Sequence, residues 1–193
     1  MNKNQIARWV STAGHPFVMI VLLVLLLSWA MDPAGALRIT GFVVAMGLIP
    51  MGWLVWRGSA SRRNRTKDPS LSSTRPVLYL SLLGVLLLSA AYFHFVEHSA
   101  FLARGSVITA VMVAVAAGLS RWLRLSLHLA FAVYSGLILA KIHLGYGLPI
   151  LLLAPLLAWS RLVLLRHTLP EVIGGALLGL GAAAGLIGLW THG

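Results

Sequence analysis

Residues 169–190 read LPEVIGGALLGLGAAAGLIGLW, and Glu171 is the only charged residue among them. About 20 consecutive apolar residues are needed to cross the hydrocarbon core of a bilayer as a helix. The stretch is therefore predicted to be a transmembrane helix. Within it, Gly175 and Gly179 form a small-xxx-small pair, which permits close packing against another helix. We assign these glycines to packing and to no chemistry.

Six further apolar stretches precede this one. They cover residues 16–31, 36–56, 76–95, 101–119, 126–145 and 148–163. The first and the sixth are short for a full crossing. Lys3 and Arg8 precede the first stretch as in a signal sequence, but no small-residue cleavage site follows, so it is retained as an anchor. We expect an all-α, polytopic transmembrane bundle of six or seven spans, with residues 1–193 forming a single membrane domain.

The composition supports this class of protein. Of the 193 residues, 59% are hydrophobic and 10% are charged, whereas about a quarter of the residues of a soluble domain are charged. The absence of cysteine excludes disulfides and thiolate metal sites. A net charge of +11 would suggest nucleic acid as the partner of a soluble protein. In a membrane protein it favours contact with anionic headgroups, so a bilayer and no nucleic acid is expected.

The basic residues predict an orientation. Between the second and third stretches lies the long polar segment 58–75. With seven spans, this segment shares one side of the membrane with most of the lysines and arginines: Lys3, Arg8, Arg57, Arg62, Arg63, Arg65, Lys67, Arg75, Arg121, Arg124, Arg161 and Arg166. The other side has Arg38, Arg104 and Lys141. Cytoplasmic loops carry such an excess, so the amino terminus and the basic segment are predicted to be cytoplasmic.

One polar run lies directly before the last span. It contains Arg161, His167 and Glu171, within SRLVLLRHTLPE over residues 160–171. A helix that opens at Thr168 or Leu169 would place His167 beside free backbone N–H groups, which attract anions. Arginine adds a planar fork that matches phosphate oxygens. The alternative is structural: Thr168 and Glu171 fit a capping box, and the arginines fit cytoplasmic anchors.

Two other clusters are predicted on the same face. His128 follows Arg124 at the start of the fifth span, and Lys67 and Arg75 precede the third. Two spans separate each cluster from the next, so the three would share one side of the membrane. Cations and two histidines that converge on one face favour a phosphate site.

These residues resemble the motifs of the type 2 phosphatidic acid phosphatase superfamily, over about residues 67–188. The third motif, Ser-Arg-x5-His-x3-Asp, is matched by Ser160, Arg161, His167 and Glu171, with glutamate in place of aspartate. The other motifs are Lys-x6-Arg-Pro and Pro-Ser-Gly-His. Here seven residues separate Lys67 from Arg75, and Ser126-Leu127-His128 lacks the proline and the glycine. Two spans also lie between the first and second motifs, where better-known members have a loop.

The resemblance implies a helical core and a metal-independent, two-step displacement without a cofactor. His167 would be the nucleophile, Glu171 its orienting partner and His128 the acid and base. Lys67, Arg75 and Arg161 would bind the phosphate. His94, Glu97 and His98 offer a weaker metal pattern, which we interpret as interfacial polar residues, as we do Lys141, His143 and Tyr146.

The expected activity is a lipid-phosphate phosphatase in the inner (plasma) membrane, with its site on the cytoplasmic face. Candidate substrates are phosphatidate, phosphatidylglycerophosphate and polyprenyl mono- or diphosphates, and the sequence does not choose among them. A lipid phosphotransferase would use the same residues. The changes at Leu127 and Glu171 also leave open a catalytically inactive lipid-binding or transport protein.

Overall fold

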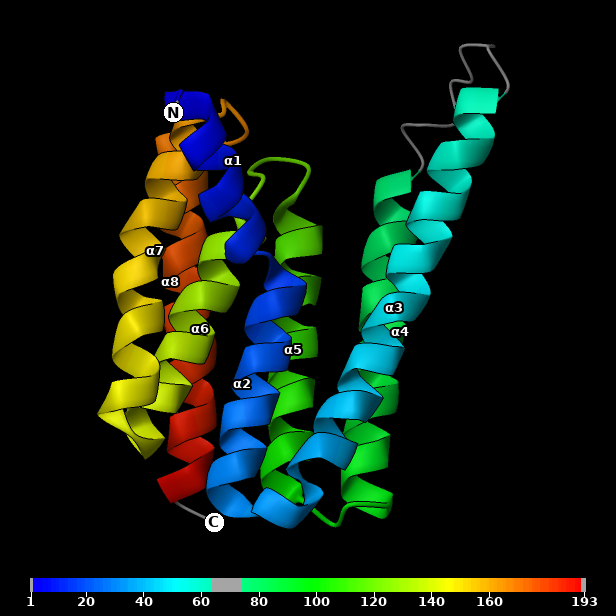
Figure 1. Cartoon of the computed structure of the whole chain (residues 1–193), viewed down its shortest axis with the longest axis vertical. Helices are drawn as coiled ribbons and strands as arrows, with labels where there is room; N and C mark the ends of the chain where they lie inside the picture. Colours follow the sequence, from blue (N-terminus) through cyan, green and yellow to red (C-terminus); the bar gives the residue numbers. More distant parts are fainter. Residues whose placement is uncertain (1, 64–73, 192–193) are drawn as a thin grey trace. The chain divides into compact units, whose positions relative to one another are not determined.

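The structure is a computed structural model that describes the backbone of residues 2–63 and 74–191, and their side chains except those of 50, 51, 53–63, 74–78 and 191. Over these residues the fold is entirely α-helical, with no strand. The helices are α1 (Lys3–Ala13), α2 (Pro16–Met31), α3 (Pro33–Arg63), α4 (Thr74–Phe95), α5 (Ala100–Leu119), α6 (Leu127–Ile142), α7 (Leu144–Val163) and α8 (Leu169–Thr191) (Figure 1).

Each of the seven predicted apolar stretches is helical. Among the described residues, α5, α7 and residues Leu169–Trp190 of α8 are long and apolar enough to cross a membrane. The pair α1 and α2, bent by 45°, is a fourth candidate if it forms one broken span. Shorter apolar helices cover Pro33–Ile49, Tyr79–Phe95 and Leu127–Ile142. The chain is therefore a helical membrane protein, as its composition predicts.

The main differences from the predicted helices are found at three places. α7 begins at Leu144 rather than at residue 148, because His143 ends α6 and its side chain caps the next helix by accepting from the N–H of Gly145. α3 continues to Arg63, into the segment predicted to be a polar loop from residue 58, where alanine and arginine favour a helix. α1 was not predicted, although a capping box of Asn2 and Gln5 opens it.

The described chain divides into two compact units, Met1–Thr40 with Gly118–Gly193, and Gly41–Ala117. In the first unit α6 is the central helix and packs against α2, α7 and α8. Its buried residues lie on all sides and include Phe131, Tyr134, Ile138 and Leu139. A helix that is apolar all round is expected in such a central position.

Glycines bring α8 close to α6. A Cβ atom added at Gly175 would collide with the backbone of Ser126, and one at Gly179 with the backbone of Ala130. The prediction that this pair serves helix packing is confirmed. The contact matters for the site described below, because it joins the first turns of α6 and α8.

In the second unit the ring of Phe42 in α3 stacks on Tyr92 in α4, with centroids 3.7 Å apart. The Tyr92 hydroxyl donates to the carboxylate of Glu97 at 2.6 Å. This contact ties the end of α4 to the segment that leads into α5.

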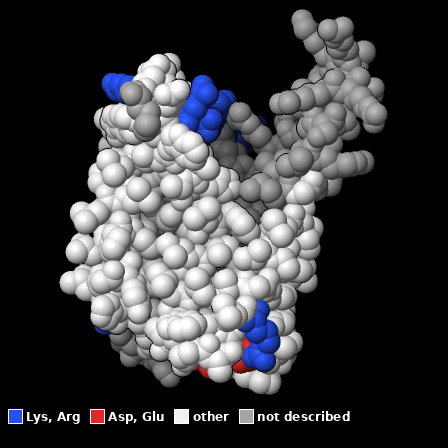
Figure 2. Space-filling view, viewed as in Figure 1, with Lys and Arg blue, Asp and Glu red and all other residues white. Residues whose placement is uncertain are grey.

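Large apolar side chains face outward along the helices. Those exposed by more than half include Leu37, Leu88, Val111, Leu152 and Leu177. In the view of Figure 2 the sides of the described helices carry almost no charged atoms, which lie at the helix ends instead. Exposed apolar area of this extent suits lipid and not water.

Candidate active site

The segment between α7 and α8 delivers His167 to the start of the last helix. α7 ends in a Schellman motif, in which the backbone N–H groups of Leu165 and Arg166 donate to carbonyls of the last turn at 3.0 and 3.1 Å. Leu165 holds the left-handed position of this motif, with a φ of 51°, where glycine is usual. α8 then begins at Leu169, so His167 precedes its amino terminus, as predicted.

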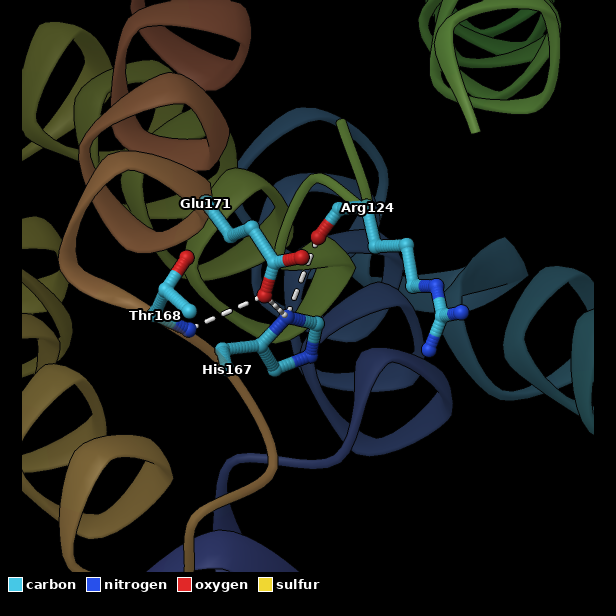
Figure 3. A network of polar contacts seen from close by, with 4 residues as sticks. All are labelled: Arg124, His167, Thr168 and Glu171. Carbon is cyan, nitrogen blue, oxygen red and sulfur yellow. Dashed lines mark hydrogen bonds and ion pairs between the residues drawn. The ribbon is translucent and has the colours of Figure 1, made fainter. Parts of the chain in front are cut away.

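The Nδ1 atom of His167 faces two acceptors (Figure 3). The carbonyl oxygen of Arg124 lies 3.0 Å away and Oε2 of Glu171 lies 3.1 Å away. A carbonyl and a carboxylate accept only, so Nδ1 must carry the hydrogen. In the neutral ring the lone pair is then on Nε2. Histidine in this tautomer presents Nε2 as a nucleophile.

The two alternatives for Glu171, a capping residue or a partner of His167, are combined in one oxygen atom. Oε2 of Glu171 accepts from the backbone N–H of Thr168 at 2.9 Å while it contacts Nδ1 of His167. The first contact is half of a capping box. It also holds the carboxylate in place for the second contact.

Burial lowers the pKa of His167, and the positive charge of Arg161 lowers it further. The charge and hydrogen bond of Glu171 and the Arg124 carbonyl act in the opposite direction, but they do not reverse the shift. His167 is therefore neutral at pH 7. Neutral histidine is the form that can attack phosphorus.

Arg161 lies in the last turn of α7 with only 6% of its surface exposed. One terminal nitrogen, NH1, donates to the hydroxyl of Ser11 in α1 at 2.7 Å. Its Nε is buried and has no hydrogen-bond partner among the described residues. A buried guanidinium with an unsatisfied donor is costly unless an anion completes it. The charge of Arg161 acts on both His128 and His167.

His128 lies in the first turn of α6, beside the segment that holds His167. The backbone N–H of Ser126, the N-cap residue of α6, donates to the carbonyl of Glu171 at 3.0 Å. The hydroxyl of Ser126 is fully buried and has no partner within the described part of the chain. The cluster of Arg124 and His128 and the run from Arg161 to Glu171 are thus joined directly through the backbone.

Within the first unit, α1, the segment before α6 and the segment before α8 all lie at one end of the helices (Figure 1). The cluster of Arg124 and His128 and the run from Arg161 to Glu171, which were predicted to share one side of the membrane, thus lie at the same end of the first unit. The turn between α6 and α7 lies at the opposite end, with Lys141, His143 and Tyr146.

The structure brings together His128, Arg161, His167 and Glu171. Lys67 lies outside the described residues. Arg75 is in the first turn of α4, in the second unit, and its side chain is also outside the described part.

Two residues near the site were not predicted. Ser11 contacts Arg161, and the ring of His15 meets that of His128 edge to face, with centroids 5.4 Å apart. His15 precedes Pro16, and a polar residue before proline is a known sign of a helix start. No sequence signal separates Ser11 from the other polar residues of α1.

The weaker metal pattern is not assembled. Glu97 accepts the hydroxyl of Tyr92, and the ring of His94 lies against that of Phe95. No group of three or more histidine, aspartate or glutamate side chains able to hold a metal ion occurs among the residues that the structure describes.

No protein-family model, curated protein or solved structure matches this chain.

Proposed function

We propose that this protein is a lipid-phosphate phosphatase with a core like that of the type 2 phosphatidic acid phosphatases, acting through a phosphohistidine on His167. One observation carries the proposal. His167 is held at Nδ1 by two acceptors, which leaves Nε2 free, and the buried Arg161 beside it has an unpartnered Nε. A nucleophile next to an incomplete cation site suits a phosphate ester.

In the first step the Nε2 lone pair attacks phosphorus while the bond from phosphorus to the leaving oxygen breaks. His128, in its protonated form, donates a proton to that oxygen. Negative charge brought by the bound phosphate favours this form of His128. In the second step neutral His128 takes a proton from water, the hydroxide attacks phosphorus, and the P–N bond breaks. Phosphate leaves and His167 regains its lone pair.

Arg161 would stabilise the negative charge on the transferring phosphoryl group. The family resemblance assigns the same role to Lys67 and Arg75. Phosphoryl transfer depends mainly on positioning and on cations at the equatorial oxygens. Glu171 stabilises the Nδ1–H of His167 as positive charge develops on the ring. No metal or cofactor takes part in this scheme.

A lipid substrate is favoured by the position of the site. Trp9 in α1 and Trp122 in the segment before α6 are 71% and 80% exposed, and both belong to the end of the first unit that carries His167. Exposed tryptophan at a helix end is typical of the headgroup layer. A phosphate bound there would belong to a lipid such as phosphatidate, phosphatidylglycerophosphate or a polyprenyl phosphate.

We further propose that the site faces the cytoplasm. Without Lys67, Arg75 and Arg161, the side assigned to the motifs still has nine lysines and arginines against three. Short loops and tails carry the most reliable bias of this kind. Single cysteines at Ser61 and Ser99, in this cysteine-free chain, test it in intact cells. Labelling of the first position from outside by an impermeant maleimide, with the second protected, would overturn the orientation.

The activity is tested with purified protein and a panel of lipid phosphates, with and without an acceptor lipid. Phosphate release that resists chelators and is inhibited by vanadate is the expected result. Release only as a phosphorylated acceptor would make the protein a transferase. Binding of lipid phosphate without turnover across the panel would make it a lipid-binding or transport protein.

A further inference from the structure

The break between α1 and α2 lies against the site, although neither helix carries a motif residue. α1 packs on α7, and Gly14, which follows α1, is so close to the side chain of Leu157 that an added Cβ would collide with it. One residue on each side of this break contacts a side chain of the proposed site. Ser11 contacts Arg161, and His15 contacts His128.

The local structure fixes the ring of His15. This residue is the N-cap of α2, and its Nδ1 accepts from the N–H of Phe17 at 3.3 Å. Pro16 follows it at the first helical position, which sets the direction of the chain. The ring then meets His128 edge to face, at an interplanar angle of 83°.

His128 lacks other restraints of this kind. Among the described residues its ring has no hydrogen-bond partner. The stretch before it, Leu125-Ser126-Leu127, contains neither the proline nor the glycine of the family motif. The edge-to-face contact with the ring of His15 is therefore the contact available to orient the His128 ring. In the same way, the Ser11 hydroxyl holds one nitrogen of the buried Arg161.

We infer that the α1–α2 break is a positioning element of the active site, in which His15 orients His128 and Ser11 orients Arg161. The inference rests on the proposed function for its kinetic consequences. The contacts themselves are independent of that function, and they can be tested without any turnover.

His15→Asn separates orientation from capping, because asparagine is also a preferred N-cap residue. A misplaced catalytic group slows the reaction, so kcat is expected to fall by about tenfold or more, with little change in KM. The matched control is His143→Asn. His143 caps α7 in the same way, with Nδ1 accepting from Gly145 at 3.2 Å, but it is exposed at the other end of the unit.

Ser11→Ala removes the side-chain partner of Arg161. We expect weaker vanadate inhibition and a KM raised by about tenfold, the size of one lost hydrogen bond to a charged group. Thr12→Ala is the control, since it removes a hydroxyl from the neighbouring, exposed position of α1, where Thr12 donates to the carbonyl of Arg8.

A double-mutant cycle decides whether His15 acts through His128. In a His128→Ala background, His15→Asn should have almost no further effect, because the group it orients is gone. Full additivity, or an equal loss in His143→Asn, would overturn the inference. His15→Ser, which also keeps a capping side chain, replaces the asparagine variant if that one does not fold.

A readout without turnover separates this inference from the proposed function. The rate at which diethyl pyrocarbonate modifies His128, followed at that residue by mass spectrometry, should rise by about threefold or more in His15→Asn because the ring loses its cover. The rate at His143 should not change. An unchanged rate at His128 overturns the positioning role, whatever the lipid assays give. A raised rate without phosphatase activity supports the positioning role and counts against the proposed function.

Discussion

The two ends of the first unit use the same residue types in different surroundings. At one end His143 caps α7 and its ring centroid lies 4.9 Å from that of Tyr146, and Lys141 is in the last turn of α6. All three side chains are exposed. At the other end His15 caps α2 with the same local geometry, but its ring is half-buried against His128.

The difference lies in which group is buried. Among the described residues, buried hydroxyls without a partner occur near the site at Ser126 and away from it at Ser28 and Thr40, whereas the buried cation with an unpartnered donor, Arg161, belongs to the end with His167. Water would satisfy such a group if it were exposed, as the polar side chains at the end with His143 are. A cap, a cation and an aromatic ring therefore do not by themselves mark a functional site. A buried cation with an unpartnered donor does so more sharply, because a buried charge is far more costly than a buried hydroxyl when no ligand completes it.

The largest effect is expected from removing the nucleophile. His167→Ala should abolish phosphate release, a loss of roughly a millionfold if the residue forms the covalent intermediate. His128→Ala should slow turnover and let an acid-labile, base-stable phosphoprotein accumulate from a substrate with a good leaving group. His143→Ala should keep normal activity. Wild-type rates in His167→Ala would contradict the assignment of the active site to the end with His167.

The second effect concerns the charge of Glu171. Glu171→Gln retains an oxygen that accepts from Thr168, so the helix start and the melting temperature should change little. It removes the negative charge beside Nδ1 of His167, and activity should fall by roughly 10³- to 10⁴-fold, as for other carboxylates that orient a reacting histidine. Near-normal activity in a folded variant would show that Glu171 only caps the helix and has no catalytic role.

The third effect is on pH dependence. The pKa of His167 lies below its ordinary 6.5 because of burial and Arg161. Neutral His167 attacks, so its protonation sets the acidic limb of the kcat/KM profile, and that limb should lie below pH 6.5. Glu171 raises this pKa, so the residual activity of Glu171→Gln should decline at still lower pH. Ionisation of the substrate and of His128 is common to both profiles and cancels in the comparison. A shift toward higher pH would contradict the contact in Figure 3.

The smallest effect tests the packing behind the site. A Cβ at Gly175 meets the backbone of Ser126, whereas nothing lies within 4 Å of one at Gly181. Gly175→Ala should lower stability by about 1–3 kcal/mol, the usual cost of overpacking, and should also reduce activity because the start of α6 moves. Gly181→Ala should be neutral or slightly stabilising, since alanine favours a helix. Thermal unfolding in detergent measures both, and equal melting temperatures would argue against the close α6–α8 contact.

Local patterns were sufficient for much of this protein. The apolar stretches predicted seven helical segments, and the ends at Phe95, Leu119 and Val163 agree with the structure. The motif resemblance predicted Glu171 as the partner of His167, and the structure has Oε2 of Glu171 at 3.1 Å from Nδ1 of His167. The small-xxx-small glycines predicted a close helix contact, because small side chains let backbones approach.

Other features depend on contacts that no local pattern encodes. Ser11 and Arg161 are 150 positions apart, and the Arg124 carbonyl meets His167 across 43. The early start of α7 follows from a cap by His143, which competes with continuation of α6. Sequence by itself determined where the apolar helical segments lie and which residues can meet over a few positions. The first follows from residue type, and the second follows from local chain geometry. Only the tertiary structure decided which of the seven histidines lie beside a buried arginine whose Nε has no hydrogen-bond partner among the described residues, because burial is a property of how the helices pack.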